Sequence, residues 1–362
     1  MADPSNIAQP ALLFIPDISG FTNFVKTTEI NHARHIIEEL LNKLVDANQL
    51  GLKVSEVEGD AIFFVRPGPP PSAEEFFAQV KRMFVAFHAH LKLYESRRIC
   101  HCGACSAAQK LKIKFVAHHG VIAESRIADR AKHFGEDVIA VHRLLKNSVQ
   151  SPDYVLVTDT VRKSWGSTPA WVALQSGADT YDCGKFGYAF APLAALESEV
   201  PQPEPMDFAS PQTMRALTAC ERTVDAPMEL LFDIATDLPL RVKWVNTVYK
   251  VELLNDRLNR SGTRHRCIAE EKIPLLVTGP GEHGQDLLSF TESDEKKMAC
   301  AVYVFRRVAP DRTQARIEFF VKDSLPVRLL FGLMKGKMGR NFETNLANLA
   351  RYCEAQHRTG AT

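Results

Sequence analysis

The sequence predicts an α+β protein with two domains, and three observations support this prediction. Its 362 residues exceed what one hydrophobic core usually supports. Residues 197–212 begin Glu197-Ser-Glu-Val-Pro-Gln-Pro-Glu-Pro, and prolines at this density cannot form a helix or a central strand. Strands and helices alternate before this stretch, whereas strands dominate after it. We therefore expect domains at residues 1–196 and 213–362, joined by a linker.

Composition limits the functions open to the chain. A formal net charge of +1 argues against broad electrostatic capture of nucleic acid or acidic membranes. The first ten residues lack the basic region of a secretory signal. No stretch approaches the roughly 20 apolar residues that span a bilayer. We expect a cytoplasmic protein with no transmembrane segment and no nucleic-acid partner.

In the first domain, short apolar runs predict strands and helical periodicity predicts three helices. Strands are expected at residues 11–15, where Pro16 should end the run, and at 52–65 around a turn at Glu58-Gly59-Asp60, 111–117, 154–157 and 188–190. Helices are expected at 29–45 and 138–145. A third opens at Ser72 and Glu75, a capping-box pair. Its predicted core face is Phe76, Val80, Met83, Phe84, Phe87 and Leu91.

In the second domain, strands follow one another and a long helix closes the chain. Strands are expected at 216–224, 248–254, 264–270, 287–292, 299–306 and 314–321, with a short helix at 228–237. The last helix begins near Pro326 and is faced by Met338, Phe342, Leu346, Leu349 and Cys353. The simplest packing of these elements is a curved antiparallel sheet wrapped around the last helix.

Two aspartates lie on predicted turns. Asp17 ends an apolar strand just before Gly20, and Asp60 follows Gly59 at a hairpin tip. If the two turns adjoin, the carboxylates form an oxygen-rich pair suited to Mg²⁺ or Mn²⁺. Such ions polarise a triphosphate and activate a sugar hydroxyl. The alternative is that each Asp serves only its own turn.

These residues resemble the metal-binding motifs of class III adenylate and guanylate cyclases. The resemblance rests on Phe14-Ile-Pro-Asp17-Ile-Ser-Gly20-Phe-Thr22 and on Gly59-Asp60, and it extends over residues 11–161. It implies a ferredoxin-like α/β sandwich. It also implies a metal site at Asp17, Ile18 and Asp60, and Arg143 as the catalytic arginine. Gly20, Phe21, Thr22 and Glu56 would contact a nucleotide, and a glutamate at position 56 is similar to the guanylate type.

The sequence departs from the cyclase pattern at two positions. Ile139 replaces the asparagine that orients the ribose, so near-attack geometry should suffer. Lys132, at the second base-selecting position, fits neither the adenylate nor the guanylate pattern. Family cyclases build their sites between two such domains, so a homodimer would be required.

Three thiols cluster within six residues. Cys100-His-Cys102-Gly-Ala-Cys105 suits a tetrahedral Zn²⁺ site, with His119 as the fourth ligand and His101 or His118 as alternatives. A reduced thiol loop, a redox switch and an iron–sulfur cluster remain open. The insertion and the segment His142-Arg-Leu-Leu-Lys-Asn147 resemble an uncharacterised bacterial group of the cyclase superfamily. This resemblance favours a regulatory role over efficient cyclisation.

The second domain resembles START-like (SRPBCC, polyketide-cyclase-like) proteins. The resemblance rests on residues 220–227, 232–238 and Trp244 and on the closing segment 339–349, and it implies a helix-grip fold. Such domains often bind an apolar small molecule or lipid between sheet and helix. The candidate cavity residues are Trp244, Tyr303, Phe305, Phe319 and Met334, although apolar residues at these spacings fill cores by default, so core packing is the favoured interpretation of each.

Two functions follow from these patterns. The favoured one is a signalling or regulatory protein in which a degenerate cyclase-like module binds metal and nucleotide, and a START-like module binds a hydrophobic ligand. The alternative is an active Mg²⁺- or Mn²⁺-dependent cyclase that prefers GTP and is controlled by that ligand.

Overall fold

The computed structural model describes residues 8–26, 30–99, 103–127, 130–254, 258–269 and 273–360. They form two compact units. The N-terminal unit contains the chain up to Glu95 and then Gly103–Pro203, and the C-terminal unit contains the chain from Glu204. The segment that begins at Ser96 lies in the C-terminal unit, although the sequence assigned it to the first domain. The reason is hydrogen bonding, because Arg97 donates to the carbonyl of Glu204 and accepts from the amide of Ser261.

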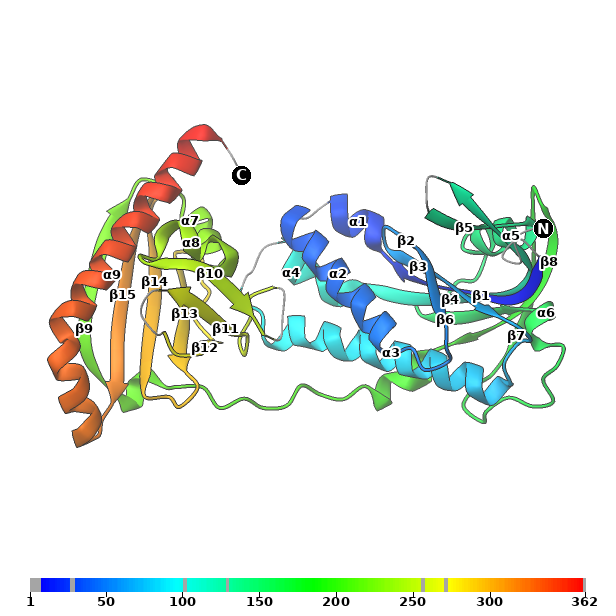
Figure 1. Cartoon of the computed structure of the whole chain (residues 1–362), viewed down its shortest axis with the longest axis horizontal. Helices are drawn as coiled ribbons and strands as arrows, with labels where there is room; N and C mark the ends of the chain where they lie inside the picture. The colour runs from blue at the N-terminus through cyan, green and yellow to red at the C-terminus, as the bar shows by residue number, and fades with distance from the viewer. Residues whose placement is uncertain are drawn as a thin grey trace. The chain divides into compact units, whose positions relative to one another are not determined.

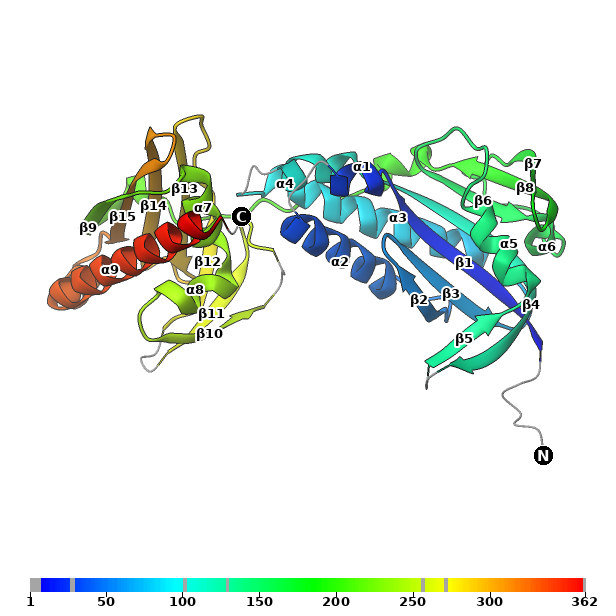
Figure 2. The same ribbon diagram turned by 90° about the horizontal axis from the view of Figure 1, so that it is seen from above.

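The N-terminal unit is built on one mixed sheet with helices on both faces (Figures 1 and 2). The strand order is β2-β3-β1-β4-β6-β8-β7, and β5 pairs with β4. The strands are β1 Gln9–Ser19, β2 Lys53–Glu58, β3 Ala61–Pro67, β4 Lys112–Ile127, β5 Arg130–Phe134, β6 Tyr154–Thr158, β7 Gln175–Tyr181 and β8 Gly184–Pro192. The helices are α1 Phe21–Lys26, α2 Ile30–Asp46, α3 Ala73–Ser96, α4 Gly103–Ala107, α5 Glu136–Leu144 and α6 Asp159–Arg162.

The first part of this unit has the ferredoxin-like arrangement. The chain runs β1-α2-β2-β3-α3-β4, and these strands lie in the order β4-β1-β3-β2 with antiparallel pairing throughout. Beyond β4 the sheet continues with β6, which is parallel to β4. The sandwich expected from the cyclase resemblance therefore agrees with the observed topology.

Strand β1 is buried on both faces. Leu13 and Ile15 pack in one cluster with Val141 and Leu144 of α5. Phe14 points to the opposite face, where its ring lies 5.8 Å from both Phe76 of α3 and Phe115 of β4. A strand with both faces covered must be apolar almost continuously, which explains the run Ala-Leu-Leu-Phe-Ile.

Pro16 does not end β1, contrary to the expectation. The strand continues to Ser19, and Pro16 stays in register with Phe115 of β4. Pairing with β3 is recorded at Phe14 and again at Asp17, but not at the two residues between them. A proline is tolerated because the amide it lacks is not needed by the ladder at this point.

The capping box and core face of α3 are confirmed. The Ser72 amide donates to Glu75 Oε2 over 2.9 Å, and the Glu75 amide donates to Ser72 Oγ over 3.3 Å. The core-face side chains named from the sequence are all buried. Helix α3 is joined to α2 by a buried polar contact, in which Tyr94 donates to Glu39 over 2.5 Å.

A buried histidine ties β4 to α5 and β6. His118 Nε2 lies 2.8 Å from Asp137 Oδ1, and its Nδ1 lies 2.9 Å from Thr158 Oγ1. The other oxygen of Asp137 accepts the Val121 amide over 2.6 Å. Burial lowers the pKa of His118, although Asp137 opposes the shift. His118 is therefore a structural link here.

This contact predicts that Gly120→Ala destabilises the protein. A Cβ at Gly120 would lie 2.0 Å from Cγ of Asp137, so the carboxylate would have to leave His118 and Val121. We expect a loss of about 1–3 kcal/mol in the free energy of unfolding, typical of overpacking, measured by urea denaturation. Gly166→Ala is the control, because a Cβ there meets nothing within 4 Å. Equal stability of both variants would contradict the contact.

The C-terminal unit is an antiparallel sheet with a long helix. The strand order is β10-β11-β12-β13-β14-β15-β9. The strands are β9 Met214–Val224, β10 Val248–Leu253, β11 Arg264–Ala269, β12 Leu276–Gly279, β13 Leu287–Asp294, β14 Ala299–Ala309 and β15 Arg312–Lys322. The helices are α7 Met228–Thr236, α8 Arg241–Trp244 and α9 Leu325–Thr359, and α9 contacts β9, β15, α7 and α8.

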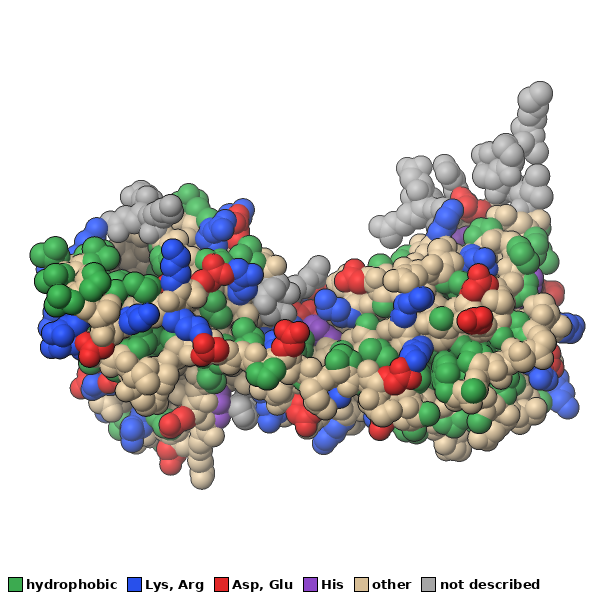
Figure 3. Space-filling model, turned by 90° about the horizontal axis from the view of Figure 1, so that it is seen from below, with side chains coloured by type: hydrophobic (Ala, Val, Ile, Leu, Met, Phe, Trp, Pro, Cys, Tyr) green, Lys and Arg blue, Asp and Glu red, His purple; other side chains and the backbone are tan. Residues whose placement is uncertain are grey.

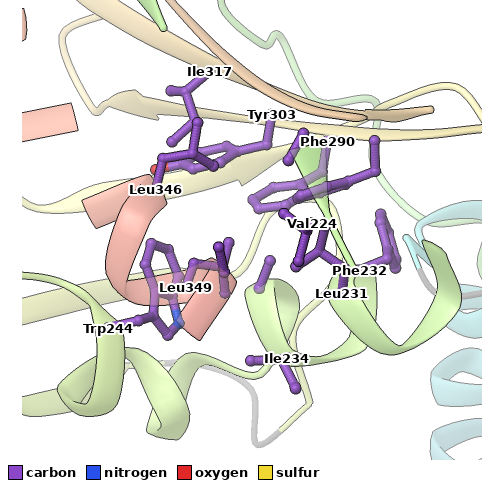
Figure 4. Close-up of a cluster of buried hydrophobic side chains, with 14 of the residues drawn as sticks. Val224, Leu231, Phe232, Ile234, Trp244, Phe290, Tyr303, Ile317, Leu346 and Leu349 are labelled. Carbon is purple, nitrogen blue, oxygen red and sulfur yellow. The ribbon is translucent and has the colours of Figure 1, made fainter. Parts of the chain in front are cut away.

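The core of this unit lies between the sheet and three helices (Figure 4). Phe290 and Tyr303 of adjacent strands stack with ring centroids 4.5 Å apart. Leu346 and Leu349 of α9 join the same cluster, as does Trp244 of α8. The predicted inner face of the last helix is confirmed for its second half.

Two short 3₁₀ helices lie at the two ends of the linker. A 3₁₀ helix at Ala194–Glu199 enters the predicted linker and ends before Pro201. A second one, Pro211–Thr213, precedes β9. None of the described helices is both long and apolar enough to cross a membrane.

Candidate functional site

The structure brings Asp17 and Asp60 together. Asp17 lies near the end of β1, opposite Ala61 of β3, and the amide of Ile18 donates to the carbonyl of Asp60 over 3.0 Å. Two glycines shape the adjoining turns, since Gly20 has φ +90° and Gly59 has φ +64°, conformations that favour glycine. The predicted adjacency of the two turns is thus present.

Lys114 of β4 belongs to this cluster. It lies opposite Asp17 in the strand register, and its Nζ is 3.2 Å from Asp17 Oδ2 and 3.0 Å from the carbonyl of Leu145. Lys114 was not predicted from the sequence. The available signal was its spacing, because Lys114, Val116 and His118 follow one another at every second position and therefore lie on one face of β4.

Burial and mutual repulsion shape the two carboxyls. Burial raises the pKa of Asp17, and the ammonium of Lys114 offsets part of the shift. Burial and then the charge of Asp17 raise the pKa of Asp60 to about 6. The cluster therefore holds two acidic groups and one fixed cation, and a further positive charge would stabilise both carboxylates.

The two carboxylates suit a divalent cation whose remaining ligands are waters or phosphate oxygens. No group of three or more His, Cys, Asp or Glu in the described ranges is arranged to hold a metal. Two carboxylates can still hold Mg²⁺, which usually keeps waters and completes its shell with phosphate oxygens. Asp17 and Asp60 are the residues that would hold the ion, and the backbone at Ile18 positions Asp60 for it.

The predicted nucleotide-contacting residues surround this cluster. Phe21 opens α1, and its ring is 3.9 Å from the position of a Cβ at Gly59, so it packs on the β2–β3 turn. Thr22 is exposed on the next turn. Gly20 accepts the amide of Phe24 through its carbonyl over 3.0 Å.

The two positions that the cyclase resemblance assigns to base selection face each other. Glu56 Oε2 lies 3.6 Å from Lys132 Nζ across β2 and β5. Next to them, Ser55 Oγ is 2.7 Å from His133 Nδ1. The sequence treated Glu56 and Lys132 separately, whereas the structure pairs them.

Arg143 is paired with a carboxylate outside the aspartate cluster. Its Nε and Nη2 donate to the two oxygens of Asp182, each over 2.9 Å, in a bidentate pair. Ile139, on the same helix, is 48% exposed, so it is available on the surface but offers no polar atom. Asn147 donates to Tyr154 over 2.8 Å and is occupied as well.

The thiol cluster is described only at its last member. Cys100 and Cys102 lie outside the described residues, and Cys105 is buried in α4. His119 does not lie beside Cys105, because His119 pairs with Leu12 near the start of β1, while α4 contacts α1 and α2 beyond the end of β1. Seven strand residues separate His119 from Lys112, roughly 23 Å. His119 Nε2 instead lies 3.1 Å from the carbonyl of Gly68.

The candidate cavity residues of the C-terminal unit divide into two groups. Trp244, Tyr303, Phe305 and Phe319 are buried in the core cluster. Met334 is on the exposed side of α9, so it does not share their surroundings.

A buried ion pair that the sequence analysis missed lies beside this core. Arg241 of α8 donates to Glu292 of β13, both almost fully buried, and Arg241 Cζ lies 5.7 Å from the ring centroid of Trp244. Burial opposes the charge, yet Glu292 raises the pKa of Arg241. The pKa of neighbouring His265 is well below its usual value because of burial and the Arg241 charge.

Comparisons with known proteins give two sequence matches and several structural ones. A family model described as "Protein of unknown function (DUF2652)" matches residues 37–154. The uncharacterized protein Rv2561/Rv2562 of Mycobacterium tuberculosis is 37% identical over 123 residues, 34% of this chain. The chain spans 57% of the length of that relative.

Solved structures similar to the chain include cyclase domains. The guanylate cyclase domain of RhGC from Catenaria anguillulae, in complex with GTP, is 14% identical with a TM-score of 0.39, covering 51% of this chain and 97% of its own. The adenylyl cyclase CyaB from P. aeruginosa is 14% identical with a TM-score of 0.36, covering 51% and 95%. Hypothetical protein jhp0584 from Helicobacter pylori has a TM-score of 0.32 at 13% identity, covering 37% and 86%. These similarities define no activity for this chain.

The buried pair makes a prediction about stability. Arg241→Met and Glu292→Leu should each lower the free energy of unfolding by about 3–5 kcal/mol, because each leaves the charge of the other residue buried and uncompensated. The double variant Arg241→Met/Glu292→Leu should lose less than the two single losses combined. Lys250→Met is the control, since its pair with Glu252 is exposed and should not change stability measurably. Additive losses in urea denaturation would show that the two side chains act independently.

Proposed function

We propose that this chain is a regulatory protein whose N-terminal unit binds a nucleotide through Mg²⁺ or Mn²⁺ at Asp17 and Asp60. The observation that supports this is the adjoining pair of partly buried carboxyls with raised pKa values. Strand pairing fixes the backbone of Asp17, and the amide of Ile18 holds the carbonyl of Asp60 in the adjoining turn. A divalent cation relieves the repulsion between the two carboxylates and brings phosphate oxygens to the same turns.

The exposed ion pairs around the cluster suit recognition of a nucleotide. Lys132 and Arg143 each hold a carboxylate at the surface, and such pairs exchange partners at little cost in free energy. When Lys132 moves to a phosphate, Glu56 becomes free to accept hydrogen bonds from a guanine edge. This arrangement favours GTP over ATP.

Efficient cyclisation is disfavoured because Ile139 supplies no hydrogen bond to a ribose. Arg143 would also have to leave its exposed pair with Asp182 to reach a substrate. The second candidate is therefore an active cyclase, in which nucleotide binding releases Arg143. The bound metal would supply Lewis-acid stabilisation of charge on the phosphates.

The aspartate pair predicts metal binding that depends on pH. Mn²⁺ affinity, measured by calorimetry with a non-hydrolysable GTP analogue present, should fall about tenfold between pH 7.5 and pH 5. The sign follows from the pKa of Asp60 at about 6, because below that pH a proton competes with the metal. Asp60→Asn should abolish the pH dependence and most of the affinity.

Asp46→Asn is the matched control, since Asp46 is exposed at the end of α2. Wild-type affinity in Asp60→Asn would refute the metal assignment. The choice between the two functions needs mass spectrometry of products after incubation with Mn²⁺ and ATP or GTP. A cyclic nucleotide formed by the wild type but not by Asp17→Asn/Asp60→Asn would establish the enzyme.

We further propose that the C-terminal unit binds an apolar molecule that carries an acceptor oxygen. Arg241 Nε and Trp244 Nε1 are buried and find no hydrogen-bond partner among the described residues. Orphaned buried donors are costly, so a partner from outside the chain would stabilise them. The aromatic residues beside them would contact the apolar body of the ligand.

The prediction is that Trp244→Phe weakens ligand binding in a protein that still folds. The variant keeps an aromatic ring but removes a donor that has no partner among the described residues, so the hydrogen bond to the ligand is lost, and the smaller ring also leaves a cavity in the core. Affinity for a dansyl-labelled undecanoic acid should fall about five- to tenfold, measured by fluorescence titration. Trp171→Phe, in the N-terminal unit, should have no effect. Identical affinities for wild type and Trp244→Phe would exclude this site.

A further inference from the structure

The first three turns of α9 present an exposed apolar ridge. Leu325, Leu329, Leu330, Leu333 and Met334 are exposed by 69%, 65%, 57%, 91% and 42%. Figure 3 shows hydrophobic side chains gathered with Lys and Arg side chains at the end of the C-terminal unit where α9 begins. Contiguous exposed apolar surface of this kind marks an interaction site.

The ridge lies opposite the face by which α9 packs on its own sheet. Val327 is buried, and the rings of Phe331 and Phe342 lie 6.1 and 5.2 Å from Phe319 of β15. Leu325, Leu329 and Leu333 follow one another at intervals of four residues on the outer face. The inner face alone attaches this half of α9, so the fold does not require the outer leucines.

Positive charge borders the ridge on one side and is also present within it. At about 100° per residue, Arg328 and Lys335 lie on one side of the leucines, and Lys337 lies between the lines of Leu333 and Leu330. Arg340 continues the line of the ridge itself. The sequence contains no Asp or Glu between Ser324 and Phe342. The nearest acid is Asp323, 3.7 Å from Arg328.

We propose that this half of α9 docks on an anionic lipid surface. An apolar helix face accompanied by basic side chains is the arrangement by which helices lie in the plane of a membrane interface. The leucines enter the acyl boundary while the long basic side chains extend to the lipid phosphates. The absence of acidic residues along this half removes the repulsion such a surface would otherwise exert. This surface is separate from the aspartate cluster and from the Arg241 pair.

The experiment is co-flotation of the full chain with vesicles. One set contains phosphatidylcholine alone, and the other contains 30% phosphatidylglycerol, at 50 and 500 mM NaCl. The wild type should bind the anionic vesicles at 50 mM NaCl and at least tenfold more weakly at 500 mM. Leu329→Ser/Leu333→Ser should lower the partition coefficient at least tenfold. Lys335→Gln/Arg340→Gln should lower it about tenfold on anionic vesicles only.

Tyr249→Ser/Val308→Ser is the matched control, because both side chains are exposed apolar residues elsewhere in the C-terminal unit. It should bind as the wild type does. Circular dichroism confirms that each variant is folded, and the two sets of substitutions test the ridge and the charges independently.

Three results would overturn the proposal. One is failure of the wild type to float with anionic vesicles. Another is equal binding to both vesicle types at both salt concentrations. The third is a dimer in solution that dissociates in Leu329→Ser/Leu333→Ser while vesicle binding is unchanged, since the ridge would then contact a second copy of the chain.

Discussion

The N-terminal unit depends on burial of β1 from both faces and pairing of β1 on both edges. Leu12, Leu13, Phe14 and Ile15 are almost completely buried, and a shift of one residue would exchange the two faces. The register of β1 with β3 and β4 is therefore fixed, and Asp17 is fixed with it. The backbone of Asp17 therefore stays opposite Ala61, beside the turn that carries Asp60. Burial at this place raises the pKa of both carboxyls, and the charge of Asp17 raises the pKa of Asp60 further.

The sequence predicted elements whose apolar pattern is strong and missed those whose pattern is weak. The capping box at Ser72 and the core face of α3 are local signals, and both are present in the structure. Strand β7 was missed because its sequence, Gln-Ser-Gly-Ala-Asp-Thr-Tyr, is polar and it lies at a sheet edge. Strand β12 has only four residues, too few for a period to be seen.

The same distinction applies to the candidate site. Asp17 and Asp60 were found because each lies in a local turn motif. The ion pairs around them were not predicted. A pair such as Arg143 with Asp182 joins positions 39 residues apart and leaves no pattern in the sequence. Pro16 was misjudged for a related reason. Whether a proline ends a strand depends on whether a neighbouring strand would need a backbone N–H donor at that position. This depends on the pairing of the strands, which the local sequence does not give.

The ion pairs of the N-terminal unit differ in how easily they can be exchanged. The Glu56–Lys132 and Arg143–Asp182 pairs are partly exposed, so solvent screens them and a phosphate can compete for either cation. The Lys114–Asp17 pair is mostly buried and is held in addition by the carbonyl of Leu145. Lys114 therefore remains a fixed charge, and the two surface cations are the ones that a ligand can recruit.

Helix α9 carries the exposed ridge and also contacts the segment that contains the buried donors of Arg241 and Trp244. In its second half, Asn345 accepts the amide of Asn246 over 2.7 Å and Asn348 donates to the carbonyl of Trp244 over 3.2 Å, so the helix is joined to the segment that carries the orphaned donors. In its first half the same helix carries the outer leucines. The second half of α9 is therefore fixed by polar contacts and by Leu346 and Leu349 in the core, whereas the first half is attached through its inner side chains alone. The outer leucines can be replaced without loss of these contacts, which is why they can serve a surface role.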